Sequence, residues 1–150
     1  MPSASVKKII NCKKDKLIHM VLDIEKYPEF VPWCAEGKIL ERVDKGNIIE
    51  ITADLYVGKG IFKEKYKSFV VYKKLFNIIQ VTNLNGPLKY LENKWVFKEI
   101  SQSTEVDFSV DFELKNKLLN ILMIKFFDIG LNKITNAFET RANRLFNSKD

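Results

Sequence analysis

Few residues in this sequence could carry out acid–base or nucleophilic chemistry. The single histidine, His19, falls beside the apolar face of a short predicted helix, where we expect a surface position and no catalytic role. Nucleophilic catalysis of the Ser-His-Asp type needs a base that titrates near neutral pH. No G-x-S-x-G, P-loop or G-x-G-x-x-G string occurs, and Gly58-Lys59-Gly60 lacks the third glycine of a nucleotide-binding loop. We therefore predict no catalytic residues and no enzymatic activity.

The two cysteines, Cys12 and Cys34, form no C-x-x-C pair and have no histidine cluster beside them. A structural zinc site needs about four such ligands. We expect two reduced, buried thiols, no metal site and no required cofactor.

Glu64 is the polar residue with the clearest potential to contact a ligand. In a strand over residues 61–72, alternation places Glu64 on one face with Phe62 and Tyr66, opposite three lysines at 63, 65 and 67. A carboxylate on an internal face must be paired, hydrated or neutralised. Glu64 is thus expected either to receive a polar head group or to pair with a neighbour near the rim of the sheet.

The elements that must position these residues follow from hydrophobic periodicity. A helix is predicted from Lys14 to about Glu25, and Pro28 and Pro32 then favour a constrained loop. The period-two alternation is cleanest over residues 105–114, with one wet and one buried face. Strands are predicted over residues 3–11, 39–43, 49–57, 61–72, 77–84, 91–97 and 105–114.

A long helix is predicted from about Leu118 to Phe146, with one apolar stripe formed by Phe127, Leu131, Ile134, Phe138, Ala142 and Leu145. Its most apolar part, residues 118–131, contains Asn120, Lys125 and Asp128 and is shorter than the roughly 18 apolar residues of a membrane span. Gly130 interrupts this helix, which indicates a kink, a close approach or simple tolerance.

Composition and charge limit the class of protein and its partners. The 150 residues suit one domain, with 46% hydrophobic and 29% charged residues, and the N-terminus has no apolar signal region. We expect a cytoplasmic protein. The net charge of +6 comes mainly from lysine and favours membrane head groups or RNA as partners, although a merely solvated lysine surface explains it equally well.

Sequential strands followed by one long helix predict an α+β fold in which a curved antiparallel sheet wraps the C-terminal helix. Such a sheet rarely seals against a straight helix, so we expect an apolar tunnel between them. The residues predicted to line it are Phe62, Glu64, Tyr66, Trp95, Phe97, Phe108, Phe112, Phe127 and Leu131. The residues predicted at its mouth are Tyr27, Phe30, Val31, Trp33, Gly86, Pro87 and Leu88.

Four segments resemble, in order, those of one known family. They are YPEFVPWC (residues 27–34), FKEKY (62–66), GPL followed by LENKWVF (86–97) and VDF through FEL (106–114). Together they resemble the coenzyme Q-binding, START-like proteins and the related ribosome-association toxins of the RatA type. The resemblance covers essentially the whole chain.

This resemblance implies a helix-grip (START/Bet v 1-like) fold with an apolar cavity. In the quinone-binding branch it implies non-catalytic binding of ubiquinone or a similar isoprenoid lipid, in support of respiration or quinone biosynthesis. In the toxin branch it implies binding of the large ribosomal subunit, and polyketide cyclases are more distant relatives. The expected partners are a hydrophobic small molecule first, then an anionic membrane surface touched peripherally or the large ribosomal subunit, and not DNA.

Overall fold

The computed structural model describes residues 3–57, 64–86 and 88–146. The strands are β1 (Ser3–Ile10), β2 (Cys34–Asp44), β3 (Ile48–Val57), β4 (Glu64–Lys73), β5 (Ile78–Asn85), β6 (Leu88–Ile100) and β7 (Ser103–Leu114). The helices are α1 (Lys14–Leu22), the 3₁₀ helices η1 (Ile24–Glu29) and η3 (Lys74–Phe76), and α2 (Lys117–Phe146).

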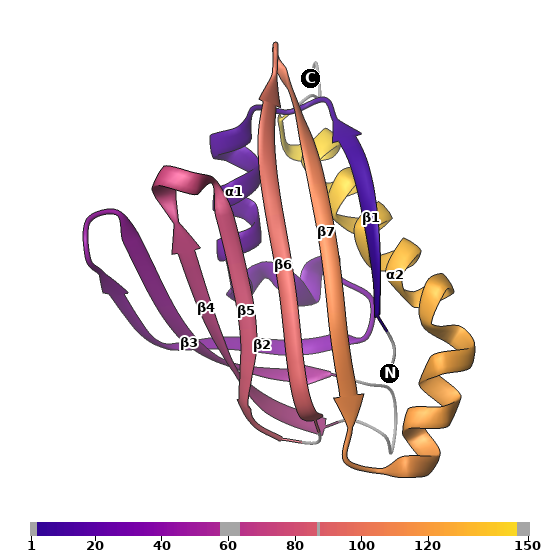
Figure 1. The fold of residues 1–150 in the computed structure, drawn as a ribbon. Helices are drawn as coiled ribbons and strands as arrows, with labels where there is room; N and C mark the ends of the chain where they lie inside the picture. Colours follow the sequence, from indigo (N-terminus) through magenta and orange to yellow (C-terminus); the bar gives the residue numbers. More distant parts are fainter. Residues whose placement is uncertain (1–2, 58–63, 87, 147–150) are drawn as a thin grey trace.

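The seven strands form one antiparallel sheet in the order β1-β7-β6-β5-β4-β3-β2. Strands β2 to β7 follow one another as a meander, and β1 returns to pair with β7, with Val6 opposite Phe108. The helices α1 and α2 lie on one side of this curved sheet, and α2 rises beside β7 before it passes behind β1 (Figure 1). The predicted α+β architecture is confirmed.

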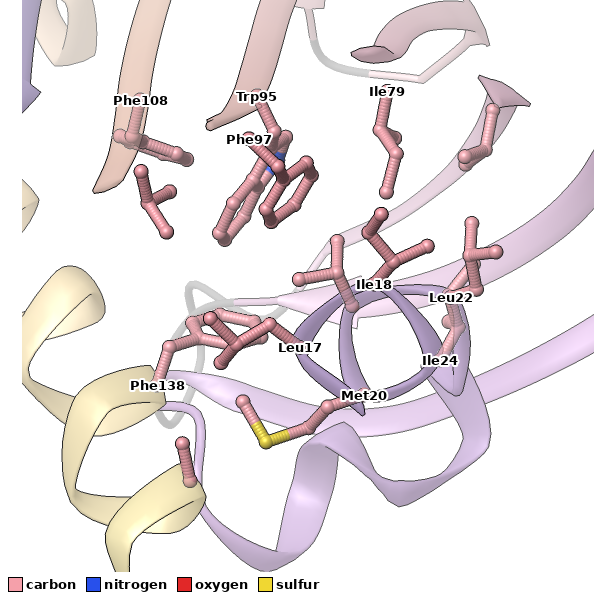
Figure 2. Packing of buried hydrophobic residues seen from close by; sticks show 14 of the residues in the cluster. Leu17, Ile18, Met20, Leu22, Ile24, Ile79, Trp95, Phe97, Phe108 and Phe138 are labelled. Atoms are coloured by element: carbon pink, nitrogen blue, oxygen red, sulfur yellow. The ribbon is translucent and has the colours of Figure 1, made fainter. Parts of the chain in front are cut away.

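Alternating side chains define the inner face of the sheet. Along β3, Ile49, Ile51, Ala53 and Leu55 are buried, while the residues between them are not. Helix α1 contributes Leu17 and its apolar neighbours to the same core, opposite the inward side chains of β5 and β6 (Figure 2). Burying each such side chain stabilises the fold by about 1.5–3 kcal/mol.

The predicted boundary of the first helix is wrong. Helix α1 ends at Leu22, and the chain continues as the 3₁₀ helix η1, which contains Pro28. Asp23 leaves the helical conformation at ψ 67°, so the chain turns before the proline is reached. The first part of the expected loop is therefore helical.

Gly37 allows η1 to lie directly on strand β2. A Cβ atom at Gly37 would lie 2.6 Å from the backbone oxygen of Ile24, which is closer than real Cβ atoms come. The backbone N–H of Ile39 also donates a hydrogen bond to Glu25 Oε2 at 3.0 Å. These contacts hold the chain after α1 against the sheet.

Candidate ligand-binding site

Three aromatic side chains from β6 and β7 form the centre of the inner face. The rings of Trp95 and Phe108 meet edge to face at 4.6 Å, and Trp95 and Phe97 lie parallel with centroids 6.3 Å apart (Figure 2). All three are buried. The Trp95 Nε1–H donates to Asn93 Oδ1 at 2.9 Å, and Asn93 Nδ2 donates to the Ser109 carbonyl at 2.8 Å. The one polar atom of the cluster is therefore satisfied, and Asn93 has a structural partner.

Phe138 of α2 joins this cluster to the aromatic residues of η1 and the loop after it. Its ring centroid lies 4.9 Å from that of Trp95, 5.5 Å from that of Tyr27 and 5.1 Å from that of Phe30. The Tyr27 hydroxyl donates to the Val21 carbonyl. Burial raises the pKa of Tyr27, so this hydroxyl stays neutral. Phe138 was predicted on the helix stripe but not as a site residue.

Two ion pairs hold the second part of α2 in place. Arg141 is 8% exposed, its Nη2 donates to Glu29 Oε1 at 2.6 Å, and its guanidinium lies 5.0 Å from the ring centroid of Phe30. The hydrogen bond from Arg141 holds the pKa of the Glu29 carboxyl below its ordinary value. On the other side, Lys8 Nζ of β1 pairs with Glu139 Oε1 at 2.6 Å. Residues 131–146, here called the trailing half of α2, are thus tied to both η1 and β1.

Residues 117–130, the leading half of α2, make a different set of contacts. At its end, the Trp33 ring lies over Gly130, where a Cβ atom would meet the ring at 3.7 and 3.8 Å. Trp33 has φ +62°, a conformation uncommon for a bulky residue, and is 43% exposed. Lys133 Nζ lies 5.8 Å from the centroid of the same ring. Of the predicted alternatives for Gly130, simple tolerance fits the structure, because these are ordinary van der Waals distances at which an added Cβ atom has room.

Several of the described residues on the outward side of the leading half are apolar. Four residues at helical spacing form what is called here the outer stripe, with exposed fractions of 69%, 64%, 46% and 58% for Leu118, Ile121, Leu122 and Ile129. The sequence analysis placed Phe127 and Leu131 of this segment on the inner stripe and noted that residues 118–131 are too short to span a membrane, but it did not predict the outer stripe. The available signal was that apolar residues occur all round this part of the helix.

Beside Trp95, where the sheet meets α2, the space is too small for a tunnel. The cavity between sheet and helix is about 20 Å³, and its lining includes Lys8, Trp95, Phe108, Thr135 and Phe138. That is room for about one water molecule. The aromatic rings at this position fill the space that curvature alone would leave. A larger groove of about 260 Å³ lies between Phe30 and the trailing half of α2.

Most predicted lining residues that the structure describes are internal. Trp95, Phe97, Phe108, Phe112 and Leu131 are buried. Tyr66 is partly buried and packs against the core, and desolvation raises the pKa of its hydroxyl. Phe62 lies outside the described residues, as does the side chain of Phe127. That these side chains line a ligand site stays a prediction.

Glu64 does not lie on an internal face, so of its two expected environments only the one at the rim of the sheet remains. It is exposed and is the first residue of β4, where it pairs with Val57 at the end of β3. Alternation gives its face, but at the rim of the sheet that face is open to water, so a charged carboxylate needs no partner.

The predicted mouth residues lie in different environments. Tyr27, Phe30 and Val31 pack against the core, whereas Trp33 is exposed. Gly86 has φ +115°, and a Cβ atom there would lie 2.4 Å from Tyr66 Cβ, so only glycine fits. Leu88 is half-buried and Pro87 lies outside the described residues.

The remaining titratable groups form no centre for metal chemistry. No cluster of three His, Cys, Asp or Glu side chains that could hold a metal ion occurs within residues 3–57, 64–86 and 88–146. Cys12 is buried and Cys34 only half-buried, and burial raises the pKa of both thiols. Over the same part of the chain, no helix is long and apolar enough to cross a membrane.

A curved antiparallel sheet that packs an aromatic cluster against a long C-terminal helix defines the START-like, helix-grip class of proteins. The chain belongs to the family described as polyketide cyclase / dehydrase and lipid transport, whose model matches residues 15–139. A START superfamily protein from Mycobacterium smegmatis has the same fold, with a TM-score of 0.81 at 21% identity over 95% of this chain and 98% of that one. The predicted fold and family are confirmed.

Two relatives are similar over most of this chain. The ribosome association toxin RatA of Rickettsia prowazekii is 35% identical over 141 residues, which are 92% of this chain and 94% of the toxin. The mitochondrial coenzyme Q-binding protein COQ10 of Dictyostelium discoideum is 32% identical over 139 residues, which are 91% of this chain and 66% of that protein.

Proposed function

We propose that this protein binds an isoprenoid quinone, with ubiquinone as the first candidate, between the sheet and α2. Binding would require no cofactor and no catalysis, and it would support respiratory electron transport or quinone biosynthesis. The observation that carries the proposal is the cluster of Trp95, Phe97, Phe108 and Phe138, three of whose flat apolar rings (Trp95, Phe108 and Phe138) line the cavity between sheet and helix. The similarity to COQ10 supports the same ligand class.

The cavity of about 20 Å³ beside Trp95 is too small for a quinone, so a ligand at this position needs α2 to move. The arrangement of contacts favours a particular motion. The trailing half is held by Phe138 and by the Arg141–Glu29 pair, while the leading half exposes its apolar residues and meets Trp33 at its end. We therefore place the entry for the ligand under the leading half, with Trp33 as the lid.

The non-catalytic part of the proposal rests on the environment of the polar groups. His19 is exposed on α1, Glu64 is exposed on β4, and Asn93 is engaged by Trp95 and Ser109. The two polar residues that line the cavity are also engaged, since Lys8 pairs with Glu139 and the Thr135 hydroxyl donates to the Leu131 carbonyl. A cyclase would need polar groups aimed at its substrate inside the cavity. Cyclase activity is therefore the third choice, in spite of the name of the family.

Binding to the large ribosomal subunit is the second candidate, because the similarity to RatA is at least as extensive as that to COQ10. RNA phosphates would be met by the lysine-rich outer face of the sheet. On that face, however, lysines are interleaved with acids: Lys7 lies opposite Asp107, and Lys65 Nζ is 3.9 Å from Asp54 Oδ2. These acidic side chains reduce the positive charge that RNA phosphates would meet, so we place RNA binding second to an apolar ligand.

Mass spectrometry of an organic extract tests the first candidate. Protein purified from a quinone-containing host should carry isoprenoid quinone or lipid, and emptied protein should take up added ubiquinone independently of salt. Protein that is empty as purified and that also fails to bind added ubiquinone would overturn the proposal. Cosedimentation with large ribosomal subunits, at low and high salt, tests the second candidate, because binding to phosphates weakens steeply with salt.

A further inference from the structure

The outer stripe of α2 leaves four large aliphatic side chains in water on one helix face. Leu118, Ile121, Leu122 and Ile129 are each at least 46% exposed. A helix face that leaves several large aliphatic side chains in water is normally covered by something. Within the trailing half the positions that continue this face are polar, as at Lys133, Asn136 and Thr140, and the exposed Leu145 lies near the end of the helix.

The dimensions of the stripe favour a position parallel to a surface. From Leu118 to Ile129 a helix rises about 16 Å, roughly half the thickness of a hydrocarbon core. A helix with a short apolar face beside charged residues lies in the membrane interface with that face among the acyl chains. Exposed Trp33 stands at the end of the stripe, and tryptophan is enriched at this depth because its ring is amphipathic.

Positive charge surrounds the stripe at both ends. Lys115 and Lys117 are exposed where α2 begins, and Lys133 is exposed beside Trp33 at the other end. Each lysine close to an anionic lipid surface increases the partitioning of a protein from water to that surface about fivefold. The pattern is aliphatic residues between lysines, with a tryptophan at the edge.

Other occupants fit this chemistry less well. Protein–protein interfaces are enriched in Tyr, Trp, Phe, Met and Arg at their core and depleted in lysine, and this surface has one such aromatic residue, Trp33, beside three lysines. RNA is bound through cations and aromatic stacking, to which four aliphatic side chains contribute nothing.

We propose that the outer stripe, together with Trp33 and Lys133, is a docking surface for an anionic lipid bilayer, on which α2 lies parallel to the membrane plane. Docking would place the lid at Trp33 against the membrane, so that an isoprenoid ligand could pass between bilayer and protein without crossing water. The docking surface itself does not depend on which ligand the protein carries.

Flotation with quinone-free vesicles tests the docking surface. Vesicles of phosphatidylcholine with a phosphatidylglycerol fraction should bind the wild-type protein, and pure phosphatidylcholine vesicles should bind it less. The double variant Ile121→Gln/Ile129→Gln should bind the mixed vesicles at least about tenfold more weakly than the wild type, because two large aliphatic groups no longer enter the acyl region. Lys133→Gln should weaken binding about fivefold.

A matched control is available in residues of the same kind elsewhere on the surface. Ile9 of β1 is 61% exposed and Leu75 of η3 is 71% exposed, so Ile9→Gln/Leu75→Gln removes equal apolar surface away from α2. This control should bind vesicles like the wild type, and both double variants should melt at the wild-type temperature. Binding of the α2 variant equal to that of the control would overturn the proposal.

Two further outcomes would also contradict the proposal. In one, the wild type ignores vesicles but forms a dimer that Ile121→Gln/Ile129→Gln dissociates, which assigns the stripe to a second copy. In the other, these substitutions abolish cosedimentation with ribosomal subunits and leave vesicle binding unchanged. The vesicles contain no quinone, so the flotation result does not depend on ubiquinone binding. Failure of the protein to bind ubiquinone in a separate experiment would refute the proposed function but not the docking surface.

Discussion

The two halves of α2 belong to one continuous helix, yet they are built in different ways. The trailing half has one buried face, with Leu131, Phe138 and Ala142 in the core, and an opposite face that is polar. The leading half exposes an apolar stripe and, at its end, is covered by a partly exposed tryptophan. This difference indicates that the trailing half holds the fold together, whereas the leading half is available for a lipid ligand and a membrane.

Phe138→Ala should produce the largest loss of stability. The ring contacts both the β6 cluster and the aromatic residues after α1, so its removal leaves a cavity and should cost about 3–5 kcal/mol of unfolding free energy. Ile121→Ala in the leading half should change the unfolding free energy by no more than about 0.5 kcal/mol, because that side chain is exposed. Urea denaturation of both variants measures the contrast. Equal losses in the two variants would remove the distinction between the halves.

Gly130→Ala should have a smaller effect of the opposite sign. An added Cβ atom would meet the Trp33 ring at an ordinary van der Waals distance of 3.7 Å, so the better helix former should stabilise the protein by up to about 1 kcal/mol. Ala137→Gly, the reciprocal change in the trailing half, should destabilise by about the same amount. Thermal unfolding of the pair is the measurement. A loss of stability in Gly130→Ala would mean that the Trp33 lid needs the bare glycine.

Glu29→Gln should have the smallest effect, visible mainly through its dependence on pH. The pKa of Glu29 is lowered by Arg141 in the folded protein, so the ion pair stabilises the fold above the ordinary carboxyl pKa of 4.5. That stabilisation is lost as the pH falls through the lowered pKa of the folded state.

The difference in unfolding free energy between wild type and Glu29→Gln should therefore be present at neutral pH and vanish in acid. Denaturation curves from neutral to acidic pH measure it. Glu41→Gln, on the exposed edge strand β2, serves as the control and should show no such trend. A difference for Glu29→Gln that stays constant with pH would show that the trailing half gains nothing from the charge of Glu29.

Much of the fold could be predicted from the sequence, because alternation and helical periodicity report directly on burial. The strand over residues 105–114 and the helix stripe through Phe138 were found in this way, as were the inward positions of Trp95 and Phe97. Leu145 is the exception, since it was predicted on the buried stripe and is 47% exposed near the end of α2.

The contacts between elements could not be predicted, because periodicity gives a face and not a partner. The Arg141–Glu29 pair joins residues 112 positions apart, and nothing in either segment indicates the other. Glu64 was placed on the correct face of a strand, but the exposed end of the sheet decides its environment. The small size of the cavity likewise depends on how the rings of Trp95, Phe108 and Phe138 pack, which sequence spacing does not determine.

Fluorescence of Trp95 tests the central claim, that a quinone binds between the sheet and α2, most directly. The chain has two tryptophans, so in the variant Trp33→Phe only Trp95, inside the aromatic cluster, emits. Titration with a short-chain ubiquinone should quench this emission saturably and independently of salt, because apolar burial drives binding. In the reciprocal variant Trp95→Phe, only Trp33 emits. If quinone quenches Trp33 in that variant but leaves the emission of Trp95 unchanged at the same concentrations, the ligand lies at the surface and not within the fold, which would contradict the account.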